Sequence, residues 1–163
     1  MRQTKTLQGG ILRLISIALM LLAQASFLSA PSFAAGGVNI DSESGFAIKG
    51  YDPVAYFVSE EAQKGSEAFV QEYQGNRWAF ANAENQQAFI ADPEAYLPQY
   101  GGHCAYAASK NSIADIDPDA WTVHDGKLYL NYSKTVRGLW RLSRDSNIEK
   151  ADGFWPQLAK QVK

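Results

Sequence analysis

Two stretches of alternating aromatic and polar residues, each interrupted by a two-residue turn, constrain the fold of this chain most strongly. The clearer one joins residues 121–124 to residues 127–132 through Asp125-Gly126. Asp-Gly favours a type I′ turn, in which both central residues adopt positive φ and the flanking strands pair tightly. We therefore predict an antiparallel hairpin with four opposed pairs: Trp121 with Leu130, Thr122 with Tyr129, Val123 with Leu128, and His124 with Lys127.

A second hairpin is predicted earlier in the chain, where residues 69–73 and 77–80 flank Gln74-Gly75. Aromatic and polar residues alternate on both arms, which is typical of strands with one buried face. The expected cross-strand pairs are Phe69 with Phe80, Gln71 with Trp78, and Glu72 with Arg77. One side of this hairpin then collects the aromatic rings.

Capping residues place helices after each hairpin. Asn82 can cap a helix through Ala91 that buries Phe89 and Ile90, and Asp145 can cap a last helix that ends before Pro156. Ser133 can cap a further helix with an inward apolar face formed by Val136, Leu139 and Trp140. The sequence thus predicts a small single α+β domain, with antiparallel β-hairpins packed against several short helices. It shows no internal repeat.

The start of the domain is expected near Phe46. Residues 35–45 are small and polar, as in a flexible leader, so the domain itself should span residues 46–163. Asp52 before Pro53 can cap a turn, and residues 54–58 favour a short extended run.

Residues 1–34 have the pattern of a bacterial signal peptide. Three basic residues precede an apolar stretch of about 15 residues, and small residues before position 35 suit cleavage after Ala34. The alternative, an uncleaved anchor, is disfavoured because a membrane span needs roughly 20 apolar residues. We therefore expect a periplasmic or secreted protein without a stable membrane anchor.

Composition excludes several classes of function. The chain has a formal net charge of −2, and removal of the basic residues of 1–34 makes the remainder more acidic, which argues against nucleic acid as a partner. Met1 and Met20 both precede the cleavage point, so residues 35–163 offer no thioether ligand for copper. We find no catalytic Ser-His-Asp pattern, phosphate loop or metalloprotease helix, and predict no enzyme.

Cys104 is the only cysteine in the chain. An unpaired thiol that persists in an oxidising compartment is inert in the core, held by a metal, or reactive. Small and aromatic neighbours at residues 105–108 suit the first alternative, since free cysteine packs as a small hydrophobic residue. A redox-active or dimer-forming thiol, activated by a helix starting at Gly102, is the third.

The metal alternative assigns Cys104 as the main ligand. A thiolate suits Cu(I) or Zn(II), and His103 is the nearest nitrogen donor in the sequence. Adjacent side chains point apart in an extended chain, so both can share one metal only if the backbone bends, which Gly101-Gly102 permits. His124 is a third candidate ligand, although the hairpin pairing puts it on an outer, polar face.

A basic stripe recurs at helical spacing opposite the apolar face of the helix that follows Ser133. Its members are Lys134, Arg137, Arg141 and Arg144. A solvated helix face is the ordinary interpretation, and an anionic headgroup or acidic partner is the alternative.

Several runs in this order resemble the exported bacterial YHS-domain family. They are residues 50–56, the aromatic hairpin, residues 82–89, Asp92-Pro93, residues 100–102, residues 104–107 and residues 125–132. The resemblance covers nearly all of residues 35–163 and implies a heavy-metal-binding or copper-binding domain. Many YHS domains carry two cysteines where this chain has Cys104 alone, and His103 stands where similar proteins have an aromatic residue.

Two functions follow from these observations. The first is a periplasmic carrier, buffer or sensor that binds copper or zinc through a low-coordinate Cys/His site. The second is a metal-free interaction or structural module in which Cys104 packs in the core. A partner protein in the periplasm fits the second, whereas a dimer formed through Cys104 belongs to the alternative of a reactive thiol.

Overall fold

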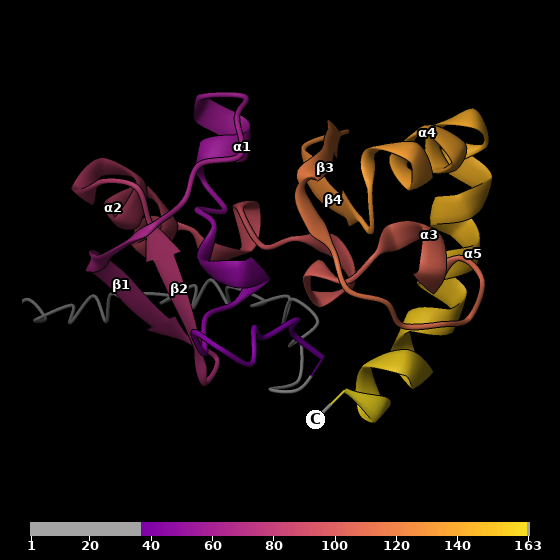
Figure 1. The fold of residues 1–163 in the computed structure, drawn as a ribbon, viewed down its shortest axis with the longest axis horizontal. Helices are drawn as coiled ribbons and strands as arrows, with labels where there is room; N and C mark the ends of the chain where they lie inside the picture. Colours follow the sequence, from indigo (N-terminus) through magenta and orange to yellow (C-terminus); the bar gives the residue numbers. More distant parts are fainter. Residues whose placement is uncertain (1–36, 163) are drawn as a thin grey trace, which may run out of the picture. The chain divides into compact units, whose positions relative to one another are not determined.

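The computed structural model describes residues 37–162, which form an α+β fold with two separate two-stranded antiparallel sheets (Figure 1). The α+β class predicted from the sequence is confirmed. The predicted signal peptide, its cleavage after Ala34 and the first two residues of the leader lie outside the described residues.

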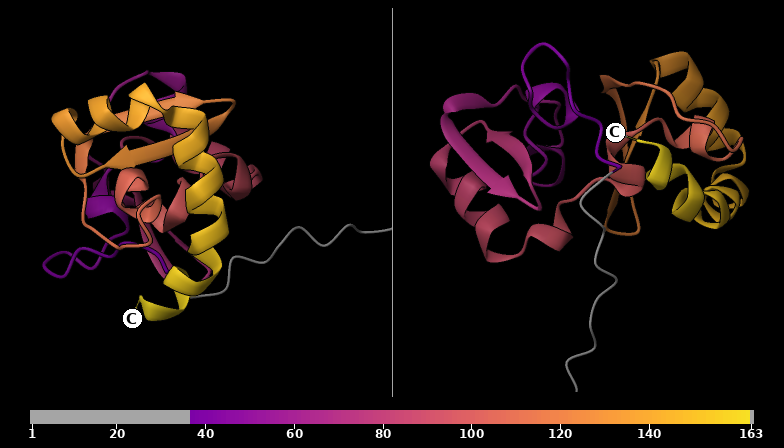
Figure 2. Two further views of the ribbon diagram at one scale, coloured as in Figure 1. Left: turned by 90° about the vertical axis from the view of Figure 1, so that its right-hand side faces the viewer. Right: turned by 90° about the horizontal axis from the view of Figure 1, so that it is seen from below.

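Elements follow one another in two similar series. The first series comprises η1 (Ile48–Gly50), α1 (Ala55–Val58), β1 (Ser66–Tyr73), β2 (Asn76–Phe80), α2 (Ala83–Ala91) and η2 (Pro93–Ala95). The second comprises η3 (Gln99–Gly102), α3 (Ala105–Ala108), β3 (Asp117–His124), β4 (Lys127–Asn131), α4 (Lys134–Leu142), α5 (Arg144–Leu158) and η4 (Ala159–Gln161). Figure 2 shows α5, in yellow, as the long helix that accompanies the second series.

Both hairpins form where the turn residues predict them. All four predicted pairs of β3 and β4 are present, and β1 and β2 pair Gln71 with Trp78 and Glu72 with Arg77. The predicted pairing of Phe69 with Phe80 is wrong. A bulge between Ser66 and Val70 shifts the register, so that Ser66 lies opposite Phe80.

The caps at Asn82 and Ser133 are confirmed, but each helix buries less than predicted. Each cap side chain accepts a hydrogen bond from the backbone N–H three residues later. Phe89 and Trp140 are fully buried, whereas Ile90 and Leu139 are exposed. Successive residues of a helix point about 100° apart, and in each of these two helices only one member of the adjacent pair faces the core.

Two predictions about segments next to proline, after Pro53 and before Pro156, are wrong. Residues 54–58 are not extended, because Asp52 accepts the N–H groups of Val54 and Ala55 and starts the helical turn α1. The last helix does not stop before Pro156: α5 continues to Leu158, whose burial together with Trp155 holds the final turn in place. Ser143, not Asp145, is its N-cap residue.

The fold also begins earlier than Phe46. Asn39 is buried, its backbone N–H donates to the Gly101 carbonyl at 2.8 Å, and its side-chain amide donates to the Gly102 carbonyl at 3.2 Å. Ile40 forms a bridge with Ala47. Residues 37–45 are therefore fastened to the domain and do not act as a free leader in this range.

The two series of elements are an internal structural repeat, which the sequence did not reveal. Corresponding elements have equal lengths: four residues in α1 and α3, eight in β1 and β3, five in β2 and β4, and nine in α2 and α4. Each first strand has a bulge near its start, and each hairpin turns through two residues of positive φ. The repeat unit is thus a turn, a short helix, a hairpin and a helix.

Backbone conformation repeats as closely as the element lengths. Three consecutive residues with positive φ open each unit, at residues 48–50 and again at residues 100–102. The N–H groups of Tyr51 and His103 each bond to the carbonyl at the start of their own turn. Tyr100 and Ile48 occupy a conformation that L-residues other than Asn and Asp seldom adopt, so tertiary packing must hold both turns.

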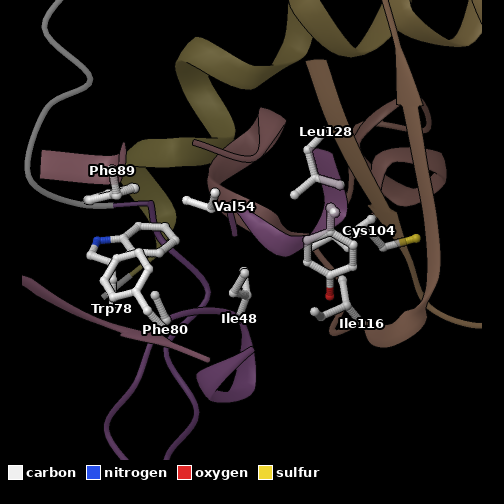
Figure 3. Packing of buried hydrophobic residues seen from close by; sticks show 11 residues of the cluster. Ile48, Val54, Trp78, Phe80, Phe89, Cys104, Ile116 and Leu128 are labelled. Carbon is white, nitrogen blue, oxygen red and sulfur yellow. The ribbon is translucent and has the colours of Figure 1, made fainter. Parts of the chain in front are cut away.

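Two apolar clusters form the core, and the β3–β4 hairpin contributes to both. Its Leu128 and Leu130 belong to a cluster with the aromatic residues of the first unit, whereas Tyr129 belongs to a cluster with Trp140 and Trp155. Figure 3 shows the first cluster running from Trp78, Phe80 and Phe89, past Ile48 and Val54, to Leu128, Ile116 and Cys104. The face of the second hairpin that was predicted to be polar and outward is therefore buried at Tyr129, whereas at its turn end His124 is half-buried and Lys127 is exposed.

Asp52 joins three elements of the first unit through one carboxylate. Its Oδ1 accepts the Val54 N–H at 2.8 Å, and its Oδ2 accepts the Ala81 N–H at 2.8 Å and the Asn85 amide at 2.6 Å. The side chain has no exposed surface. A buried carboxylate is tolerated only when such donors replace its water shell.

We predict that Asp52→Asn destabilises the protein by about 2–4 kcal/mol, because an amide cannot accept hydrogen bonds on both of its terminal atoms. Chemical denaturation monitored by circular dichroism measures the effect. Asp92→Asn is a matched control, since Asp92 also precedes proline but is exposed and makes no side-chain cap bond. Equal stability losses in the two variants would contradict this role of Asp52.

Candidate functional site

Cys104 is enclosed by backbone N–H donors. Its side chain is 1% exposed, and it is the N-cap residue of α3. The sulfur accepts the Ala107 N–H at 3.5 Å and the Tyr132 N–H at 3.3 Å. The thiol therefore links the start of α3 to the end of β4, and the predicted helix start at Gly102 is displaced to Ala105.

Cys104 occupies the position in the second unit that Asp52 occupies in the first. Each residue follows the positive-φ turn, precedes the four-residue helix and accepts an N–H from that helix. Each also accepts the first N–H after the second strand, from Ala81 in one unit and Tyr132 in the other. The sulfur thus makes the same two connections as the carboxylate.

Asn131 is the polar neighbour of Cys104 that sequence analysis missed. Its side chain is fully buried, and its Oδ1 accepts the Tyr106 N–H at 3.2 Å and lies 3.9 Å from the Cys104 sulfur, which can donate to it. Its Nδ2 has no partner among the described residues. Asn131 lies at the end of β4, opposite Asp117, and the sequence gives no signal of its burial, since polar residues at strand ends are commonly exposed.

His103 lies beside Cys104 in the sequence but packs into the second cluster. Its ring packs against Trp155 with centroids 5.9 Å apart and planes tilted by 43°, and 7% of the residue is exposed. Burial lowers the pKa of the imidazole, opposed by the Ala114 carbonyl and the Asp115 carboxylate. The Ala114 carbonyl acts on the ring only as a weak acceptor, and neither ring nitrogen has a partner of good hydrogen-bond geometry in the described part of the chain.

His124, the third predicted ligand, lies at the end of β3 next to carboxylates. Its Nε2 is 3.3 Å from Asp125 Oδ2 and 3.7 Å from Asp145 Oδ1. Across residues 37–162, no three His, Cys, Asp or Glu side chains are grouped closely enough to hold a metal ion. The structure therefore does not bring His103, Cys104 and His124 together as one ligand set.

The basic stripe is divided between two helices. Lys134, Arg137 and Arg141 belong to α4, whereas Arg144 begins α5 after a break at Ser143. Arg137 donates to the Trp121 carbonyl at 3.1 Å, and Arg144 pairs with Asp145 at 3.1 Å. Two of the four cations thus have partners within the domain, and Lys134 and Arg141 are exposed.

Within the described range, no helix combines the length and the apolar character needed to cross a bilayer. Comparison of the chain with protein-family models, curated proteins and solved structures finds no match.

We predict that acid destabilises the protein partly through His103. The pKa of His103 in the folded protein lies below its usual value of 6.5. As the pH falls, His103 therefore becomes protonated more readily in the unfolded chain than in the folded protein. Stability is then fully present above about pH 6.5 and decreases as the pH falls below that value. His103→Phe should lose less stability than the wild type between about pH 7.5 and pH 5 in denaturation experiments.

The matched control is His124→Gln, which keeps His103 and should retain its share of the acid-induced loss. If His103→Phe and the wild type lose equal stability over this range, His103 is not the group responsible.

Proposed function

We propose that this protein is an exported, metal-free interaction module in which Cys104 is a structural residue of the core. The observation that carries the proposal is the correspondence of Cys104 with Asp52, since the same two backbone connections are made by a sulfur in one unit and a carboxylate in the other. A sulfur that accepts hydrogen bonds from two backbone N–H groups has a structural role in the fold.

The burial of the thiol suits the proposed location. Export rests on the signal-peptide pattern of residues 1–34, and an oxidising compartment would attack an accessible unpaired thiol. With 1% of Cys104 exposed, oxidants and partner thiols reach the sulfur only after local opening. A dimer formed through Cys104 would need the same opening, so we favour a noncovalent partner.

Copper or zinc binding is the second candidate function, and one specific observation favours it. Neither nitrogen of the buried His103 ring has a partner of good hydrogen-bond geometry among the described residues, and a buried imidazole left in this state is costly. Cys104 and His103 would be the ligands of a low-coordinate Cu(I) or Zn(II) site, as the YHS-domain resemblance implies. His124 does not lie with these two residues, so a third ligand would require either a rearrangement that brings His124 closer or a donor from a second molecule.

Metal binding would demand a rearrangement at the sulfur. A metal takes the thiolate as a ligand at roughly 2.3 Å for zinc, and the sulfur would have to weaken its contacts with Ala107 and Tyr132 to turn toward it. That cost makes the metal-free module the better-supported function.

The structural role predicts slow thiol labelling and a clear loss of stability on truncation. Under native conditions a thiol reagent should modify Cys104 at least about 100-fold more slowly than in the unfolded chain, because it must wait for local opening. Cys104→Ala should cost about 2–3 kcal/mol, since two N–H groups lose their acceptor, and Cys104→Ser should cost less because its hydroxyl can still accept. Rapid native labelling, or an alanine variant as stable as the wild type, would overturn the structural role.

A titration with Cu(I), and separately with Zn(II), in the presence of a competing chelator tests the second candidate. If the metal function holds, one equivalent binds to the wild type, and both Cys104→Ser and His103→Phe bind at least about tenfold more weakly. His124→Gln is the control for nonspecific histidine binding. No stoichiometric binding, or unchanged binding in both ligand variants, would exclude this site.

A further inference from the structure

A hollow in the second unit lies between the turn end of the β3–β4 hairpin and one face of α5. It is open to solvent and has a volume of about 370 Å³. The hairpin contributes His124, Asp125, Lys127 and Tyr129 to its lining, and α5 contributes three carboxylates and one isoleucine. Cys104 does not line it, so the hollow is separate from the junction described above.

The helix spreads its three carboxylates along the hollow. Asp145, Glu149 and Asp152 stand at positions i, i+4 and i+7 of α5, so they lie on one face, and Ile148 lies among them. Seven residues of helix rise by about 10 Å, which separates the first carboxylate from the third. Accordingly, no three acidic, His or Cys side chains of residues 37–162 are grouped closely enough to hold a metal ion. The hollow thus offers negative charge at two ends, with an apolar residue between them.

The carboxylates retain oxygens that are free to accept hydrogen bonds. Each of the three aspartates uses one oxygen within the domain: Asp125 with His124 at 3.3 Å, Asp145 with Arg144 at 3.1 Å and with His124 at 3.7 Å, and Asp152 with the Tyr100 hydroxyl at 2.9 Å. The second oxygen of each aspartate, and both oxygens of Glu149, have no partner among the residues that the structure describes.

Charge restricts the ligand to a cation. Four carboxylates line the hollow, whereas the permanent cations near it are Lys127 and, beside Asp145, Arg144. Lys127 is exposed and forms no ion pair with the described residues, so it leaves the carboxylate oxygens unoccupied. Four negative charges against two positive ones leave an excess of two. Because carboxylate oxygens only accept hydrogen bonds, the cation must also carry donors.

Tyr129 directs a free hydroxyl into this acidic hollow. The residue is 3% exposed, and its ring packs against Tyr100 and Trp140 with centroids 6.0 Å and 5.1 Å away. The hydroxyl has no hydrogen-bond partner in the described part of the chain, although Tyr129 lines the hollow. Unlike the indole nitrogen of Trp140, its oxygen is not fully enclosed, so a bound molecule can reach it.

The surroundings of this hydroxyl favour a cationic donor. Burial raises the pKa of Tyr129 to about 12, the Asp152 and Asp125 carboxylates raise it further, and Arg144 opposes them. The hydroxyl therefore stays neutral and lies in the field of both carboxylates. Its oxygen can accept a hydrogen bond from an ammonium group whose charge the same carboxylates balance.

We propose that this hollow binds a primary alkyl diamine in its doubly protonated form. One ammonium group donates to the Tyr129 hydroxyl and to Asp152, and the other lies between Asp145 and Glu149. The methylene chain between them covers Ile148. The inference goes beyond the interaction module proposed above and does not depend on the role of Cys104.

Titration of the ¹⁵N-labelled protein with 1,5-diaminopentane at about pH 8 and constant low ionic strength tests the proposal, since primary amines are protonated at this pH. We expect saturable shifts that are largest in the backbone amides of residues 124–129 and 145–152, with a Kd on the order of 1 mM. Two analogues separate the contributions. 1-Aminopentane lacks the second charge, and 1,5-bis(trimethylammonio)pentane keeps both charges but has no N–H donors. Each should bind at least about fivefold more weakly.

Variants with matched controls locate the site. Glu149→Gln and Tyr129→Phe should each weaken binding of the diamine at least about threefold, because each removes one acceptor. The control for the first is Glu84→Gln, which makes the same change of charge at an exposed position of α2, and the control for the second is Tyr132→Phe, which removes an exposed hydroxyl. Both control variants should bind as the wild type does, whereas Lys127→Gln should bind more tightly because a like charge is removed.

The proposal is overturned by any of four results. The first is the absence of a saturable shift up to about 20 mM diamine, which would place the Kd above any specific value. The second is an equal weakening in Glu149→Gln and Glu84→Gln, which would indicate a response to net charge alone. The third is full affinity in Tyr129→Phe. The fourth is binding of the quaternary analogue, or of Mg²⁺ at the same ionic strength, as tight as that of the diamine.

Discussion

A side-chain acceptor placed between a left-handed turn and a short helix organises each unit of this protein. In the first unit, Asp52 bonds to the N–H groups that open α1 and to the N–H that follows β2. The turn, the helix and the hairpin would otherwise meet with unpaired backbone donors in the interior, at a cost of roughly 1–3 kcal/mol for each. Asn85 of α2 also bonds to Asp52, so this junction fixes α2 relative to the hairpin. The packing of Phe89 in α2 against Trp78 in β2 therefore depends on it.

The second unit meets the same requirement with less charge. A buried carboxylate needs donors for both oxygens, and Asp52 has them, with Asn85 completing the set. The Cys104 sulfur is a weaker acceptor that packs as an apolar group, so two N–H contacts and the Asn131 oxygen suffice around it. Because a thiol is nearly apolar, Cys104 can pack within the apolar cluster while it makes these contacts, which the charged Asp52 cannot do.

Sequence analysis predicted the parts of the fold that local chemistry determines. The Asp125-Gly126 turn sets the register of β3 and β4 as far as Trp121, and Asn82 and Ser133 cap the helices that follow them. Three features depend on tertiary packing, which leaves no local pattern: the bulge that displaces Phe69, the orientation of Ile90 and the burial of Tyr129. The sequence did not reveal the repeat because the two units share backbone φ values and hydrogen bonds, not residue types. A carboxylate and a thiol, for example, fill equivalent positions.

The repeat also explains why sequence motifs pointed to Cys104, although the same position in the first unit, Asp52, is structural. A lone cysteine is conspicuous in a sequence, but its counterpart shows that this position connects backbone segments. Trp78 looks like ordinary core, because it pairs with Phe89 just as Tyr129 pairs with Trp140. The two aromatic residues differ in where their polar atoms lie: a tyrosine carries its hydroxyl at the tip, whereas the indole N–H lies on the ring edge. The indole Nε1–H of Trp78 is therefore a buried donor without a partner among the described residues, at a cost of roughly 1–3 kcal/mol that the packing around the ring has to offset.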